Sequence, residues 1–181
     1  GITQVLPDKP GAYTWNKAPR LSGQVMETGA IARQLMAGQP LVRSAVAQFG
    51  GTVSTRVLAR LCEAARILVL MEGWLQELQP RGAFHAAYTV PAEGAGAGLC
   101  EAARGALGHW LRVEHGRIAN YQIVAPTSWN FSPRDAQGQA GALEMALQGT
   151  HLCLDGERPA DSVAVQHIVR SFDPCMVCTV H

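Results

Sequence analysis

The sequence lacks any run of about 18 consecutive apolar residues, so no transmembrane helix is expected. It also lacks an excess of charge of either sign, because the formal net charge is +1 and charged residues make up 16% of the chain. Neither nucleic acid nor an anionic membrane surface is therefore an expected partner. Nearly half of the 181 residues are apolar, which is enough for one domain with a core and suits a buried piece of a larger assembly.

A starting methionine is missing, and the opening Gly1-Ile2-Thr3-Gln4 has neither the basic start nor the apolar stretch of a signal peptide. We therefore expect a fragment, a processed product or a portion of a longer polypeptide. Cysteines are odd in number and irregularly spaced, which does not indicate a disulfide framework. Reduced thiols in a cytoplasmic setting, some of them binding a metal, fit better. The five cysteines are Cys62, Cys100, Cys153, Cys175 and Cys178.

Apolar spacing predicts a mixed α and β chain in which helices dominate. The second predicted helix is long and carries few charges, so we expect it to be buried on most sides. The predicted helices span residues 23–37, 54–78, 135–147 and 160–170.

The strand signals are fewer and lie in the middle of the chain. Two strand-like runs, 110–114 and 118–124, are joined by His115-Gly116-Arg117 and predict a β-hairpin. The glycine-rich stretch 92–98 is either a surface linker or a segment whose backbone approaches a site closely. The residues before Pro19 are expected to be irregular.

The pattern that carries chemistry lies near the C-terminus, where Cys175-Met176-Val177-Cys178 places two thiols in one short turn. Thiolates are soft ligands that favour nickel, copper, zinc or iron–sulfur chemistry over magnesium or calcium. A haem attachment motif needs His directly after the second Cys, where Thr179 stands, and a structural zinc site needs four ligands. Metal binding is therefore the prediction, and a surface dithiol is the alternative.

Four blocks in order resemble the large subunit of nickel–iron hydrogenases, and together they cover essentially the whole chain. This resemblance implies a mainly helical α+β fold with a small β-hairpin region. Residues 1–181 would form the C-terminal part of a single large-subunit domain whose N-terminal part is not in this chain. The blocks are Thr14-Trp15-Asn16-Lys17-Ala18-Pro19-Arg20, Glu101-Ala102-Ala103-Arg104-Gly105-Ala106-Leu107-Gly108-His109-Trp110, residues 121–135 and the tail Asp173-Pro174-Cys175-Met176-Val177-Cys178-Thr179-Val180-His181.

The resemblance also implies a nickel ion held by four cysteine thiolates, two of which bridge to an iron carrying one carbon monoxide and two cyanides. By position, Cys175 would be a terminal nickel ligand and Cys178 a bridging, catalytic one. The other two thiolates would lie in an N-terminal Cys-x-x-Cys that is absent here. We expect the remaining cysteines to be small buried hydrophobic residues.

Around that centre, the catalytic Arg104 would lie over the open coordination position, and Asp173 would pair with it close to the metals. Pro126 and Thr127 would contact a cyanide, Thr127 as a donor, and Leu107 would line the carbon monoxide pocket. Without the resemblance, an arginine on its own would be interpreted as a surface ion pair, and an aspartate before proline as a turn residue.

A second ion, magnesium or iron, is implied at His181, with the backbone carbonyl of Ile123 and an absent glutamate as further ligands. Nitrogen is an unusual ligand for magnesium, so this site rests on resemblance alone. The family usually has proline where Ala103 stands, and alanine leaves the backbone beside the next residue less restricted.

The predicted function is reversible heterolytic cleavage of H2, with an iron–sulfur small subunit completing a heterodimer. Electrons leave one at a time through such clusters, and this chain has too few cysteines for a cluster. Alternatives are a hydrogen sensor with the same centre, a relative of a respiratory complex I subunit, and a small zinc module. The end at His181 fits a processed enzyme or a sensor made without a tail, and it resembles cytoplasmic more than periplasmic members. Membrane association through partners stays open.

Overall fold

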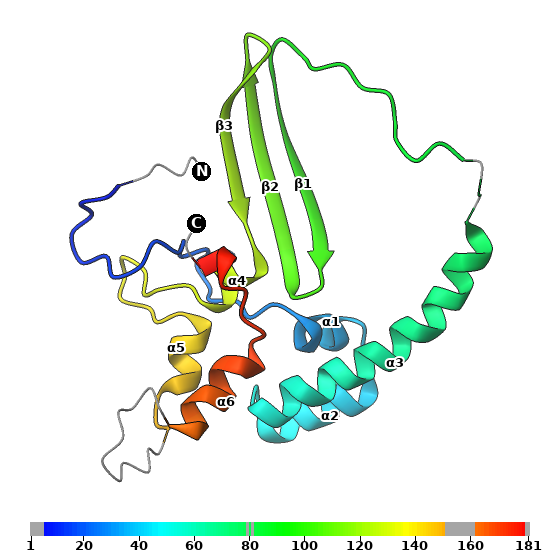
Figure 1. Ribbon diagram of the computed structural model, residues 1–181. Helices are drawn as coiled ribbons and strands as arrows, with labels where there is room; N and C mark the ends of the chain where they lie inside the picture. The colour runs from blue at the N-terminus through cyan, green and yellow to red at the C-terminus, as the bar shows by residue number, and fades with distance from the viewer. Residues whose placement is uncertain (1–5, 79, 81, 151–161, 180–181) are drawn as a thin grey trace.

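The computed structural model describes residues 6–78, 80, 82–150 and 162–179. Its mainly helical architecture with one small antiparallel sheet confirms the predicted α+β fold class (Figure 1). No helix within these ranges is long and apolar enough to cross a membrane. The elements are α1 (Ala30–Met36), α2 (Pro40–Phe49), α3 (Val53–Glu77), β1 (Gly94–Ala102), β2 (Gly105–Glu114), β3 (Arg117–Val124), α4 (Pro126–Asn130), α5 (Ala142–Leu147), α6 (Val163–Ser171) and the short 3₁₀ helix η2 (Val177–Thr179).

The first three helices pack around a small apolar core. The boundary between α1 and α2 is the Gly38-Gln39-Pro40 segment, in which the Gln39 side chain accepts a hydrogen bond from the backbone N–H of Val42 and Pro40 takes the first helical position. None of the helices predicted from apolar spacing covers α2, so this helix was missed. The core residues are Ala30, Ile31, Val42 and Ala59, with Leu35, Val46 and Cys62 packed against them.

The long helix α3 confirms the helix predicted over 54–78, but the prediction that it is buried on most sides is wrong. Its first turns pack in the core, where Ala59 is fully buried. Its second half leads away from the other helices (Figure 1), and Leu68 and Leu75 are each 66% exposed. The small number of charged residues in this helix predicted that other elements would cover it. No element of the described chain covers its second half.

Two other predicted helices are shorter than their apolar spacing suggested. The chain before α1 forms a tight turn, with a bridge between Leu21 and Gln24, and the helix begins only after Gly29, whose φ is +121°. Residues 135–141 form a turn in which the Asp135 carboxylate accepts from two backbone N–H groups. Helix α6 confirms the last predicted helix within the residues that the structure describes.

The sheet has the order β1-β2-β3, with both pairs antiparallel. The predicted hairpin is confirmed, and its turn residues His115 and Gly116 both have positive φ, which matches the twist of the strands. The interpretation of 92–98 as a linker is wrong, because β1 begins at Gly94 and pairs with β2 along its length. Alternating glycine and alanine give no apolar period, so only the pairing with β2 reveals this strand.

The turn between β1 and β2 consists of Ala103 and Arg104. The loop before α1 lies close against this turn, and each of the two segments has a glycine where they meet. A Cβ atom on Gly105, whose φ is +138°, would lie 2.5 Å from Thr28 Oγ1 and 2.7 Å from Gly29 N. A Cβ atom on Gly29 would lie 3.1 Å from the carbonyl oxygen of Arg104. This close approach fixes the position of the turn relative to α1.

Replacing Gly105 by alanine is expected to destabilise the protein by about 2 to 4 kcal/mol, since the added Cβ overlaps backbone and the positive φ becomes strained. Thermal unfolding of the assembled protein measures the loss. Gly96→Ala is the matched control, because a Cβ there meets nothing within 4 Å. Equal unfolding temperatures for the two variants would contradict the close approach.

Candidate metal centre

The two C-terminal thiols face each other directly after α6. The Sγ atoms of Cys175 and Cys178 are 2.9 Å apart, and the backbone N–H of Cys178 donates to the carbonyl of Cys175 at 3.1 Å, which closes the turn. Both side chains are half-buried. Since metal–sulfur bonds are about 2.3 Å long, both sulfurs can bind the same ion.

The short helix α4 supports this turn from the end of the sheet. The Thr127 hydroxyl accepts a hydrogen bond from the backbone N–H of Cys175 at 3.2 Å, and Thr127 is 2% exposed. Pro126 is buried at the first position of α4, where its fixed φ suits a helix start. A hydroxyl that accepts a hydrogen bond still has its own proton to donate.

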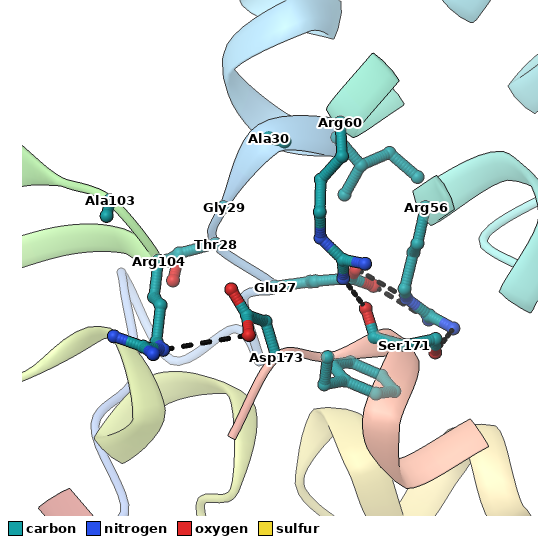
Figure 2. A pocket seen from close by; sticks show the side chains of 12 residues that line it. Glu27, Thr28, Gly29, Ala30, Arg56, Arg60, Ala103, Arg104, Ser171 and Asp173 are labelled. Carbon is teal, nitrogen blue, oxygen red and sulfur yellow. Dashed lines mark hydrogen bonds and ion pairs between the residues drawn. The ribbon is translucent and has the colours of Figure 1, made fainter. Parts of the chain in front are cut away.

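The structure places Arg104 opposite Asp173, as predicted: Arg104 Nε lies 3.7 Å from Asp173 Oδ1 (Figure 2). Asp173 follows the end of α6 and has a φ of +54°. Both side chains are about half exposed, so the ion pair contributes little to stability. The pair matters because Asp173 lies two residues before Cys175, so it brings the Arg104 guanidinium close to the two thiols.

A group of polar residues missed by the sequence analysis holds the chain just before Asp173. Arg56 on α3 makes two hydrogen bonds, of 2.7 and 2.9 Å, to the Glu27 carboxylate and lies 3.8 Å over the Phe172 ring. Arg56 also donates to the Ser171 hydroxyl at 3.3 Å. Two arginines four residues apart on a helix with few charges, Arg56 and Arg60, were the only available signal.

These residues line a small cavity of about 30 Å³, which Figure 2 shows between α1, α3 and the segment after α6. Arg60 donates a hydrogen bond to the Ser171 carbonyl across it. Arg104 and Asp173 lie at one end. The cavity has room for water or a small gas molecule and for nothing the size of an organic substrate.

The electrostatics favour thiolate at Cys175 and thiol at Cys178. The hydrogen bond from the Cys178 thiol lowers the pKa of Cys175, and burial raises the pKa of Cys178 to about 11. The positive charge of Arg104 acts to lower the pKa of both thiols. Metal binding would deprotonate both, because only the thiolate is a ligand.

The donor set fits a soft metal ion, but only in part. Within the described residues, no group of three or more His, Cys, Asp or Glu side chains is arranged to hold an ion. Cys175 and Cys178 therefore supply two thiolates and need further ligands from outside this part of the chain. This is what a centre divided between two Cys-x-x-Cys turns requires.

The structure leaves the predicted magnesium or iron site as a prediction. His181 lies outside the described residues. The Ile123 carbonyl accepts a hydrogen bond of 2.6 Å from Lys17 Nζ, and burial lowers the pKa of Lys17. A carbonyl has a second lone pair, so one further contact remains open to it.

The remaining residues singled out from the sequence differ in how far the structure agrees with their predicted burial. Leu107 is half-buried on β2, paired in register with Cys100. Cys62 packs against the helical core, as expected of a small hydrophobic residue. The same prediction is wrong for Cys100, whose place on an edge strand leaves it exposed. Cys153 lies outside the described residues.

The two half-buried thiols after α6 form a partial donor set for a soft metal ion. The model of the nickel-dependent hydrogenase family matches residues 3–181. The chain belongs to that family.

Individual relatives agree with this assignment. The chain is 36% identical to the uptake hydrogenase large subunit of Rhodobacter capsulatus, over 96% of this chain and 32% of that protein. It is 36% identical to the periplasmic NiFeSe hydrogenase large subunit of Desulfomicrobium baculatum, over 100% of this chain and 38% of that protein. The reduced Ni-Fe-Se hydrogenase of D. vulgaris Hildenborough superposes with a TM-score of 0.85 at 36% identity, over 97% of this chain and 39% of that one. The chain thus spans about a third of the length of the curated relatives it matches.

Proposed function

We propose that this chain is the C-terminal part of a nickel–iron hydrogenase large subunit, and that the assembled protein cleaves H2 reversibly into protons and electrons. The observation that supports this most is the meeting of two half-buried thiols, 2.9 Å apart, with the Arg104–Asp173 pair and Thr127. Residues far apart in the sequence, on a sheet turn, a short helix and the tail, converge on one point.

Cys175 and Cys178 would hold nickel together with two thiolates from the N-terminal part of the subunit, and Cys178 would also bridge to iron. When bound, the Ni-Fe centre with its carbon monoxide and two cyanides acts as a Lewis acid that makes hydrogen acidic enough to lose a proton. Thiolate ligands suit these metals. The positive charge of Arg104 acts to lower the pKa of both thiols, and a bound metal would deprotonate them.

The surrounding residues would position the ligands of the metal centre and polarise the bound hydrogen. Arg104 carries a permanently charged guanidinium that polarises hydrogen, or donates to a cyanide, and Asp173 holds its orientation. Thr127 accepts from the Cys175 N–H and has its own proton left to donate to a cyanide. Pro126 and Leu107 would contribute apolar surface, which excludes water from the diatomic ligands.

Two partners are expected, the N-terminal part of the large subunit and an iron–sulfur small subunit. The exposed apolar half of α3, with Leu68 and Leu75, would pack against the N-terminal part of the large subunit. An iron–sulfur small subunit would carry the electrons. The predicted second ion, magnesium or iron, would bind His181 and the Ile123 carbonyl. The cytoplasm stays the predicted location, although one relative is named as periplasmic.

The test is elemental analysis and infrared spectroscopy of the purified assembly, combined with a hydrogen oxidation assay. We expect nickel, iron, metal-bound carbon monoxide and cyanide bands, and turnover. The same bands with very low turnover would indicate a hydrogen sensor. Zinc alone, or no metal in a fully matured sample, would refute the proposal.

A further inference from the structure

One arginine outside the metal centre connects α1, α3 and the sheet. Arg33 makes two hydrogen bonds to the Glu63 carboxylate, of 2.7 and 2.6 Å, and one of 2.9 Å to Glu101. The same guanidinium donates to two consecutive backbone carbonyls, those of Ala102 and Ala103, each at 3.0 Å. These carbonyls belong to the residues immediately before Arg104.

The guanidinium is itself held in place. The hydrogen bonds from Arg33 lower the pKa of Glu63, so Glu63 is charged at neutral pH. Gln34 also donates to Glu63, at 3.2 Å. The side chains of Arg33 and Glu63 are only 21% and 13% exposed, so water competes little for these hydrogen bonds. Two-point binding of a carboxylate fixes the plane of the guanidinium.

The turn that Arg33 binds is weak by itself. Two-residue hairpins favour turns with positive φ, as at His115 and Gly116, because those match the twist of the strands. Ala103 and Arg104 both have negative φ. Alanine at position 103 also leaves φ less restricted than proline would. The turn therefore needs support from outside the sheet.

From these contacts we infer that Arg33 is a positioning residue for Arg104: it holds the β1–β2 turn so that the Arg104 guanidinium stays opposite Asp173. Glu63 orients Arg33 for this task. The inference rests on the proposed function, because it gives Arg104 a task at the metal centre.

The first test replaces Arg33 by lysine in the assembled protein. An ammonium is a single point of donation and cannot bind Glu63 twice while reaching both carbonyls. We expect amide exchange in the peptide spanning residues 102–107 to become at least about tenfold faster, while α3 is unchanged. The kcat for hydrogen oxidation should fall about ten- to a hundredfold at constant KM.

The matched control is Arg112→Lys, the same change on β2 in a half-exposed pair with Glu114. It should leave both exchange and activity at wild-type values. Unchanged exchange at 102–107 in Arg33→Lys would overturn the inference.

A rescue separates positioning from a merely structural contact between α1 and α3. Proline suits the first central residue of a turn with negative φ, so Ala103→Pro should stiffen the turn without Arg33. In the Arg33→Lys background we expect it to restore slow exchange and most of the lost kcat. No rescue would mean that Arg33 acts only through the α1–α3 contact. The exchange result holds even if the assembly proves not to oxidise hydrogen, so the two proposals fail separately.

Discussion

Serine in place of Cys175 or Cys178 is expected to abolish nickel retention and hydrogen oxidation. Each change removes one of the two thiolates that this chain supplies, and a hydroxyl is a hard, weakly acidic ligand that soft metals bind poorly. The two residues between the two cysteines, Met176 and Val177, carry no thiol that could take the place of either. The loss of activity should exceed about a hundredfold, the upper range for residues that only support metal ligands.

Metal content per assembled protein and hydrogen oxidation rate are the two measurements. Cys100→Ser is the matched control, because it is the same change at an exposed position on β1. It should retain metal and rate. Nickel retained at wild-type content in either tail variant would refute the assignment of these thiols as nickel ligands.

Arg104→Lys is expected to lower the rate of hydrogen oxidation about a hundred- to a thousandfold while the metal content stays at wild-type level. Lysine keeps the positive charge, so the thiols still feel a cation. It loses the planar guanidinium, whose Nε lies 3.7 Å from Asp173 Oδ1. Removing one correctly placed donor costs about this much in other active sites.

The separation of rate from metal content makes this prediction sharp. Arg112→Lys again serves as the control, since its partner Glu114 lies on the same exposed strand end. A variant that turns over normally would show that charge alone suffices at position 104. A variant that loses nickel as well would show that Arg104 acts in assembling the centre and not in the reaction.

Local patterns determined those elements whose signals lie within a few neighbouring residues. Strong apolar spacing over 25 residues made α3 predictable to within a residue at each end. The His115-Gly116 pair, which tolerates positive φ, predicted the hairpin. The pairing of Arg104 with Asp173 was predicted from the resemblance, because the order of four blocks along the chain carries information that one motif does not.

Other elements had no local signal to find. The first half of β1 alternates glycine with alanine and so has no apolar period, and pairing with β2 decides its conformation. Helix α2 was hidden because Gly38-Gln39-Pro40 ends one helix and begins the next, and only the second role shows in the Gln39 cap. The exposure of the apolar half of α3 could not be predicted, because burial depends on which other elements pack against a helix.

The sequence by itself determined the chemistry of this protein: a Cys-x-x-Cys turn, an arginine and aspartate to accompany it, and the family to which these belong. Only the tertiary structure decided how that chemistry is held in place. The Arg33 hydrogen bonds to the turn before Arg104, and the contacts of Arg56 with Glu27 and Phe172 before Asp173, join residues separated by about 30 to 116 positions. Such contacts leave no periodic trace in the sequence, because they depend on where the folded backbone brings distant carbonyls and rings within reach of a guanidinium.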